Sequence, residues 1–84
     1  MKLNKWDWIK KEYKTVTIPD SWNCITYSSN MDETVNCAQC GKEVKYGETY
    51  CSQEIHTVPG GMGYAVCEDC HKKEMLRRKT LQGW

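Results

Sequence analysis

The stretch Cys37-Ala38-Gln39-Cys40-Gly41 and its counterpart Cys67-Glu68-Asp69-Cys70-His71 decide how this chain folds. Each contains a Cys-x-x-Cys pair, and twenty-six residues separate the two pairs. Two thiolates two residues apart can bind one Zn²⁺ while their backbone turns back on itself, and two such pairs complete the closed tetrahedron of a structural zinc site. The spacing therefore predicts one zinc ion, held by Cys37, Cys40, Cys67 and Cys70.

A disulfide framework is the competing interpretation, because the chain has six cysteines in 84 residues. Charged residues interrupt every apolar run in Met1–Trp8 that a secretion signal would need. The chain also has no apolar run long enough to span a bilayer. We therefore expect it in the cytoplasm (the host cytoplasm if it is viral), where thiols stay reduced and paired cysteines usually hold metal. Zinc is the favoured interpretation.

The remaining cysteines and the two histidines do not stand at ligand spacing. We expect Cys24 and Cys51 to be small buried side chains, as free cysteines often are. His71 adjoins Cys70 and His56 lies in a predicted strand. Four matched cysteines leave no need for either histidine as a ligand.

Residues 1–33 are predicted to form an N-terminal extension. Apolar residues recur there at three- and four-residue steps, which predicts a short amphipathic helix with the inner stripe Leu3, Trp6, Ile9 and Tyr13. Two strands are expected next, at 15–18 and 22–27, because aromatic and β-branched residues are frequent there. The polar stretch 28–33 reads as a loop and marks the boundary with a zinc module at 34–84.

Within the module, the two cysteine pairs differ in the residues on their C-terminal side. Gly41 suits a tight turn in which backbone amides point at sulfur. Residues 49–58 and 64–66 read as two strands of a hairpin. After Cys70 the chain continues with good helix formers up to Gly83, so the last ligands are expected at the start of a helix.

This order of knuckle, β-hairpin and helix resembles the treble-clef zinc finger over residues 34–80. The matching residues are the Cys37–Gly41 knuckle, the Tyr46–Tyr50 segment, and Tyr64–Cys70 running into the helix. The resemblance implies a small, metal-stabilised α+β fold. Treble clefs occur in ribosomal proteins, nucleases, protein adaptors and DNA binders, so it does not fix function. The small size and the opening rich in lysine and tryptophan are also similar to short host-takeover proteins of bacteriophages.

We do not expect an enzyme. Treble-clef nucleases use a histidine base and further histidine or asparagine ligands around a catalytic metal. Here neither His56 nor His71 has such a partner at suitable spacing. A zinc ion with four thiolate ligands also has no open position for water or substrate.

Two features predict binding. The aromatic one is the set of tryptophans outside the zinc loop, which are interface candidates: Trp6, Trp8, Trp22 and Trp84. Trp8 is the first choice, because it falls off the predicted inward stripe. The basic one is the final helix, whose cations are candidate phosphate contacts: Lys72, Lys73, Arg77, Arg78 and Lys79.

The net charge weakly favours a protein partner over nucleic acid, because it is +1 for the chain and becomes −1 with four thiolates and one Zn²⁺. The leading hypothesis is therefore a non-enzymatic protein-interaction module that modulates or inhibits a cellular machine. A nucleic-acid-binding zinc finger and a structural subunit of a larger assembly are the alternatives.

Overall fold

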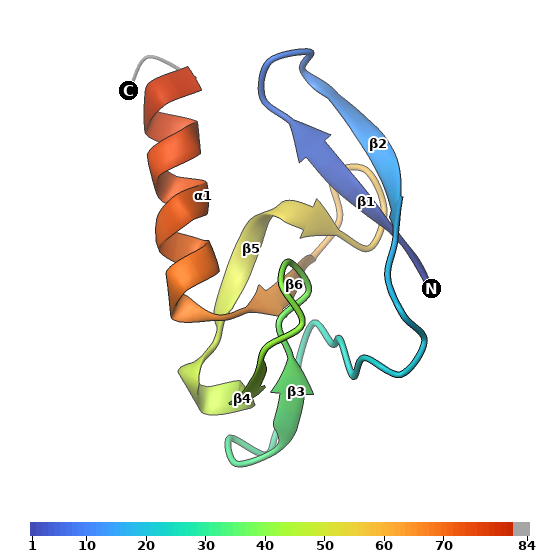
Figure 1. Ribbon diagram of the computed structural model, residues 1–84, viewed down its shortest axis with the longest axis vertical. Coiled ribbons are helices and arrows are strands. Elements are labelled where there is room, and N and C mark those ends of the chain that lie inside the picture. Colours follow the sequence, from blue (N-terminus) through green and yellow to red (C-terminus); the bar gives the residue numbers. More distant parts are fainter. Residues whose placement is uncertain (82–84) are drawn as a thin grey trace.

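The computed structural model describes residues 1–81 and shows a small α+β protein (Figure 1). One antiparallel sheet has four strands in the order β2-β1-β5-β6, and a second sheet pairs β3 with β4. The elements are β1 (Lys2–Asp7), β2 (Glu12–Thr17), β3 (Thr34–Asn36), β4 (Glu43–Lys45), a single 3₁₀ turn (Tyr46–Glu48), β5 (Tyr50–His56), β6 (Gly63–Val66) and α1 (Glu68–Leu81). The predicted α+β class is confirmed.

The predicted N-terminal helix is wrong, because residues 2–17 form the β1–β2 hairpin. Trp6 stands opposite Tyr13 in this ladder, and aromatic cross-strand pairs of this kind stabilise sheets. The turn between the strands depends on Asp7, whose Oδ1 accepts hydrogen bonds from the backbone N–H groups of Ile9 and Lys10. Ile9, expected to face inward, is therefore a turn residue with 76% of its surface exposed.

The hairpin joins the rest of the molecule through β1, which pairs with β5 at Asn4–His56 and Lys5–Ile55. The strand expected at 22–27 is absent from the structure. That segment instead connects β3 with β6. The Asn23 carbonyl accepts a hydrogen bond from the backbone N–H of Asn36, and the Ile25 carbonyl accepts one from the backbone N–H of Ala65. The division of the chain at residue 33 stays a prediction.

The apolar core lies between the four-stranded sheet and the cysteine loops. Its buried members are Leu3, Ile18, Cys37, Ala38, Ile55, Val66 and Cys67. Helix α1 adds no apolar side chain to this core beyond its ligand Cys70, among the side chains the structure describes. Its buried residue is Glu74, whereas Leu76 is 65% exposed. The helix is therefore attached by polar contacts.

Candidate metal centre

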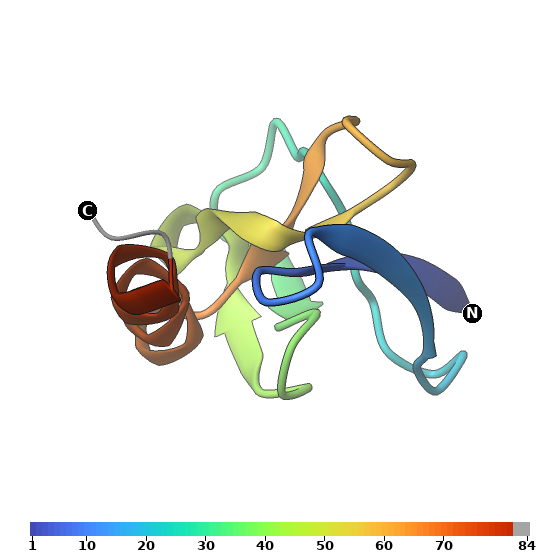
Figure 2. The same ribbon diagram turned by 90° about the horizontal axis from the view of Figure 1, so that it is seen from above.

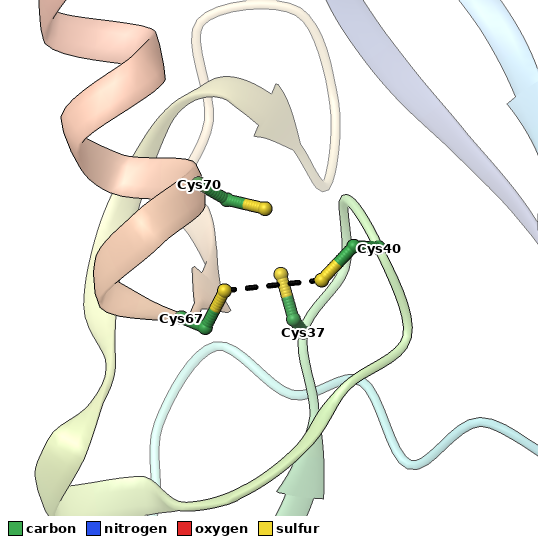
Figure 3. A group of neighbouring side chains, drawn as sticks. All are labelled: Cys37, Cys40, Cys67 and Cys70. Atoms are coloured by element: carbon green, nitrogen blue, oxygen red, sulfur yellow. Dashed lines mark hydrogen bonds between the residues drawn. The ribbon is translucent and has the colours of Figure 1, made fainter.

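Four cysteines converge from two parts of the chain (Figure 3). One sulfur from each of Cys37, Cys40, Cys67 and Cys70 belongs to a group in which all ligand atoms lie within 4.8 Å of one another. The Sγ atoms of Cys40 and Cys67, twenty-seven positions apart in the chain, are separated by 3.8 Å. The group is positioned to bind one metal ion, as the sequence predicted.

The first pair sits on a tight turn between β3 and β4. Gly41 has φ of 81°, and its N–H donates to the Cys37 carbonyl at 2.8 Å, as expected of a knuckle. The Gln39 N–H points at the Cys37 sulfur, 3.4 Å away. A Cβ at position 41 would lie 2.4 Å from the Trp22 ring. Trp22, predicted as an interface residue, therefore packs against the knuckle.

The second pair joins β6 to α1. Cys67 directly follows β6, and Cys70 lies in the first helical turn, where the His71 N–H donates to the Cys67 carbonyl at 2.9 Å. Burial, together with hydrogen bonds between this thiol and those of Cys67, Cys40 and Cys37, raises the pKa of Cys70. A cation between the four sulfurs would reverse this effect by stabilising the thiolates.

Neither histidine belongs to the cysteine group. The His71 ring instead stacks on Tyr50, with the centroids 4.5 Å apart and the planes 7° from parallel. Of the other cysteines, Cys24 is half-buried against the core, as expected. Cys51 is exposed, so its predicted burial is wrong. Its neighbour Ser52 takes the buried position on β5 instead.

Two buried carboxylates lie behind the metal site, and sequence reasoning missed them. Glu54 and Glu74 are 1% and 0% exposed. Gln39, between the first two ligands, bridges them: its Nε2 donates to Glu54 Oε1 at 2.7 Å and to Glu74 Oε2 at 3.0 Å. The knuckle is thereby tied to β5 and to α1.

Glu54 also accepts hydrogen bonds from Trp8 and Arg77, two residues that the sequence predicted to contact a partner. Trp8 Nε1 donates to its Oε2 at 2.8 Å, and the Arg77 guanidinium forms a two-point ion pair with N···O distances of 2.8 and 2.6 Å. Burial would raise the pKa of the Glu54 carboxyl, but the hydrogen bonds from Arg77, Trp8 and Gln39 outweigh it and lower that pKa. Trp8 and Arg77 are therefore structural contacts here.

Glu74 is hydrogen-bonded within the fold. The Ser52 hydroxyl donates to its Oε2 at 2.9 Å, and the Gln53 N–H donates to its Oε1 at 2.7 Å. Glu74 and Arg77 follow Cys70 at four and seven positions, so all three share one face of α1. That spacing from a predicted ligand was the sequence signal for these inward-facing charges.

The other predicted binding residues lie apart from the metal centre. Trp6 is half-buried on the hairpin, and Trp84 lies outside the described residues. Lys72 pairs with Glu68 at 3.1 Å, and Arg78 donates to the Gln53 side chain at 3.2 Å. Lys73 and Lys79 are exposed. Of the predicted phosphate contacts, Lys72, Arg77 and Arg78 thus interact with side chains of the fold, and Lys73 and Lys79 face solvent.

Comparison with protein-family models, with curated proteins and with solved structures finds no match for this chain. Within residues 1–81, no helix combines the length and the apolar character that crossing a bilayer requires.

Proposed function

We propose that the four cysteines hold one structural Zn²⁺ and that the module around it is a treble clef. Sulfurs about 2.3 Å from a tetrahedral ion lie about 3.8 Å apart, and Cys40 and Cys67 already stand at 3.8 Å. Four sulfurs suit zinc better than the oxygen-preferring cations. The knuckle, the β5–β6 hairpin and the ligand in the first turn of α1 follow the treble-clef order.

The module is proposed to be non-enzymatic. Four thiolates close the coordination of the ion, so water and substrate have no place on it. The two buried acidic groups near the site, Glu54 and Glu74, are engaged by hydrogen bonds. The proposed role of the ion is therefore structural: it keeps the surrounding loops folded so that their surface can bind a partner.

The proposed function is to bind another protein through an apolar surface on residues 18–81, here called the zinc half. This Tyr/Met surface consists of Tyr27, Met31, Tyr46 and Tyr50. Tyr27 and Met31 are 68% and 57% exposed, and this observation carries the proposal. Met31, Tyr46 and Tyr50 line a hollow of about 170 Å³. Tyrosine and methionine are enriched at the cores of protein interfaces.

The test compares affinity captures from nuclease-treated lysate of the native host. Tyr27→Ser combined with Met31→Ser should lose the proteins that the unchanged chain retains, because both side chains lie in the proposed contact. Ile9→Ser combined with Leu76→Ser removes similarly exposed apolar surface elsewhere and should retain them. Identical captures from both double variants would exclude the Tyr/Met surface.

Nucleic-acid binding through α1 alone has less support than the sequence suggested, because Arg77 is committed to Glu54. The role of structural subunit in a larger assembly stays a prediction.

A further inference from the structure

Positive charge is concentrated on two elements that meet. Residues 1–17 and 72–79 together carry ten of the twelve basic residues and three acidic ones, whereas residues 18–71 carry two basic and eight acidic ones. The hairpin turn and the second half of α1 point to the same end of the molecule in Figure 1, and in Figure 2 the turn faces the helix. Glu54 joins them, since it binds both Trp8 and Arg77. The near-neutral total therefore hides an excess of positive charge on these two elements, part of which Glu54 offsets.

An open aromatic hollow of about 340 Å³ lies at this end, lined by Trp6, Trp8, Tyr13, Gln53 and His56. Its rings do not stack on one another: Trp6 stands at 85° to Trp8 and at 64° to Tyr13. Both tryptophans and Tyr13 are half-buried, so part of each ring is accessible to solvent. The hollow therefore presents aromatic surface to a flat ligand.

A second, smaller hollow of about 180 Å³ shares Trp6 and Trp8 with the first. Its other lining residues are the basic Lys5, Lys14 and Arg77, the acidic Asp7 and Glu54, and Ile9. These two lysines are directly opposite each other in the β1–β2 ladder, an arrangement that costs stability unless an anion lies nearby. Within residues 1–81, no salt bridge involves either of them. Asp7 is the anion near them: hydrogen bonds from the turn and, to a smaller extent, the charge of Lys14 lower the pKa of its carboxyl, while Glu54 is engaged by Arg77.

We propose that this end binds single-stranded nucleic acid, with a base against the rings of Trp6 and Tyr13. Lys5 and Lys14 stand in the next row of the ladder and point to its other face, so the phosphates would reach them around the edge strand β2. Stacking on aromatic side chains beside a basic groove is how proteins bind single strands without regard to sequence. A duplex covers its base faces, so it would use the charge alone. The excess of positive charge disfavours a cationic occupant. This site is separate from the Tyr/Met surface and goes beyond the proposed function.

The first experiment tests the rings. Binding of a fluorescein-labelled twelve-nucleotide oligothymidine is followed by anisotropy for the zinc-loaded chain. Trp6→Leu and Tyr13→Leu keep apolar bulk but lose the ring, and each should weaken binding roughly 5- to 150-fold. Leu76→Ala, an exposed change on α1, should leave binding unchanged. Circular dichroism and a zinc stoichiometry of one verify that each variant is folded.

The second experiment tests the charges with a matched pair of variants. Lys5→Gln combined with Lys14→Gln should make the negative slope of log affinity against log salt shallower by about 1.4, the value for two single-strand phosphate contacts. Lys42→Gln with Lys45→Gln removes the same net charge from the acidic half and should leave the slope unchanged. Equal effects of the two pairs would show that net charge alone is sensed and would overturn the site.

A competition experiment with the labelled oligothymidine identifies the class of ligand. Unlabelled oligothymidine should displace the probe at much lower concentration than a twelve-base-pair duplex or polyglutamate. If the duplex or the polyglutamate competes equally well, or if both ring variants bind like the unchanged chain, the proposal is wrong. Loss of protein capture by the Tyr27/Met31 variant bears on the proposed function alone, so the two proposals can fail separately.

Discussion

The zinc half (residues 18–81) and the hairpin half (residues 1–17) of this molecule are stabilised in different ways. In the zinc half, four sulfurs and two buried carboxylates hold short elements together, and its residues 18–71 carry two basic and eight acidic side chains. In the hairpin half, a six-pair antiparallel ladder and edge-to-face aromatic rings do so, and the surface is basic. The two halves share one sheet, because β1 pairs with β5 across the boundary.

The largest effect expected is the loss of the metal. Cys37→Ser or Cys70→Ser should abolish cooperative unfolding, because structural zinc typically contributes roughly 10–16 kcal/mol of apparent binding free energy. Thermal melts and elemental analysis measure this. Cys24→Ser and Cys51→Ser are the controls and should keep one zinc per chain. A folded, metal-free Cys70→Ser protein would show that the zinc half does not need its ion.

The link between the halves is expected to matter next. Arg77→Ala leaves the Glu54 carboxylate buried without its cation and should lower the free energy of unfolding by roughly 2–3 kcal/mol. This is less than for a fully buried pair, because the Arg77 side chain is 41% exposed. Lys73→Ala, one turn earlier and exposed, should cost less than about 0.5 kcal/mol in the same urea titration. Equal costs would mean that the ion pair does not join the halves.

Trp8→Ala should have a smaller cost, about 1–2 kcal/mol, because it removes one of several donors to Glu54. The sequence, which placed Trp8 off the predicted inward stripe, gave no reason to expect this cost. Trp8→Phe keeps most of the ring and loses the N–H, so comparing the two in the same titration separates packing from hydrogen bonding. A melting curve unchanged by Trp8→Ala would show that the hydrogen bond from the indole to Glu54 does not help to join the halves.

The smallest effects on stability should accompany the clearest separation of function. Tyr27→Leu is expected to reduce protein capture and to spare oligothymidine binding, and Trp6→Leu to do the reverse. Each should change the free energy of unfolding by less than about 1 kcal/mol, since neither side chain is fully buried. Capture and anisotropy on the same preparations provide the measurement. If one variant abolishes both activities, the halves do not act independently.

The zinc half was largely predictable because its constraints are local in sequence. Cysteine spacing predicted the ligands, Gly41 the knuckle turn, and the helix formers after Cys70 the position of α1. The hairpin was not predictable in this way. Leu3, Trp6, Ile9 and Tyr13 fall at helical spacing, but in the structure Leu3 faces the core, Ile9 lies in the turn and Trp6 pairs with Tyr13.

The hairpin turn could not be recognised from the sequence, because it contains no glycine or proline. Asp7 starts it by accepting two backbone hydrogen bonds, and Lys11 takes a positive φ of 55° that glycine usually adopts. The buried carboxylates escaped prediction for another reason. Glutamate is almost never fully buried unless paired, and the partners of Glu54 come from positions 8, 39 and 77. Pairing over such distances is a property of the fold.

The polar inner face of α1 has a calorimetric consequence. When unfolding exposes apolar surface, the heat capacity rises, and when it exposes polar surface, the heat capacity falls. Release of α1 from β5 would bring water to the Glu74 carboxylate, the Arg77 guanidinium and the amide of Gln39. Separation of this helix on zinc chelation should therefore add little to the heat capacity and, for the same reason, bind little of a hydrophobic dye.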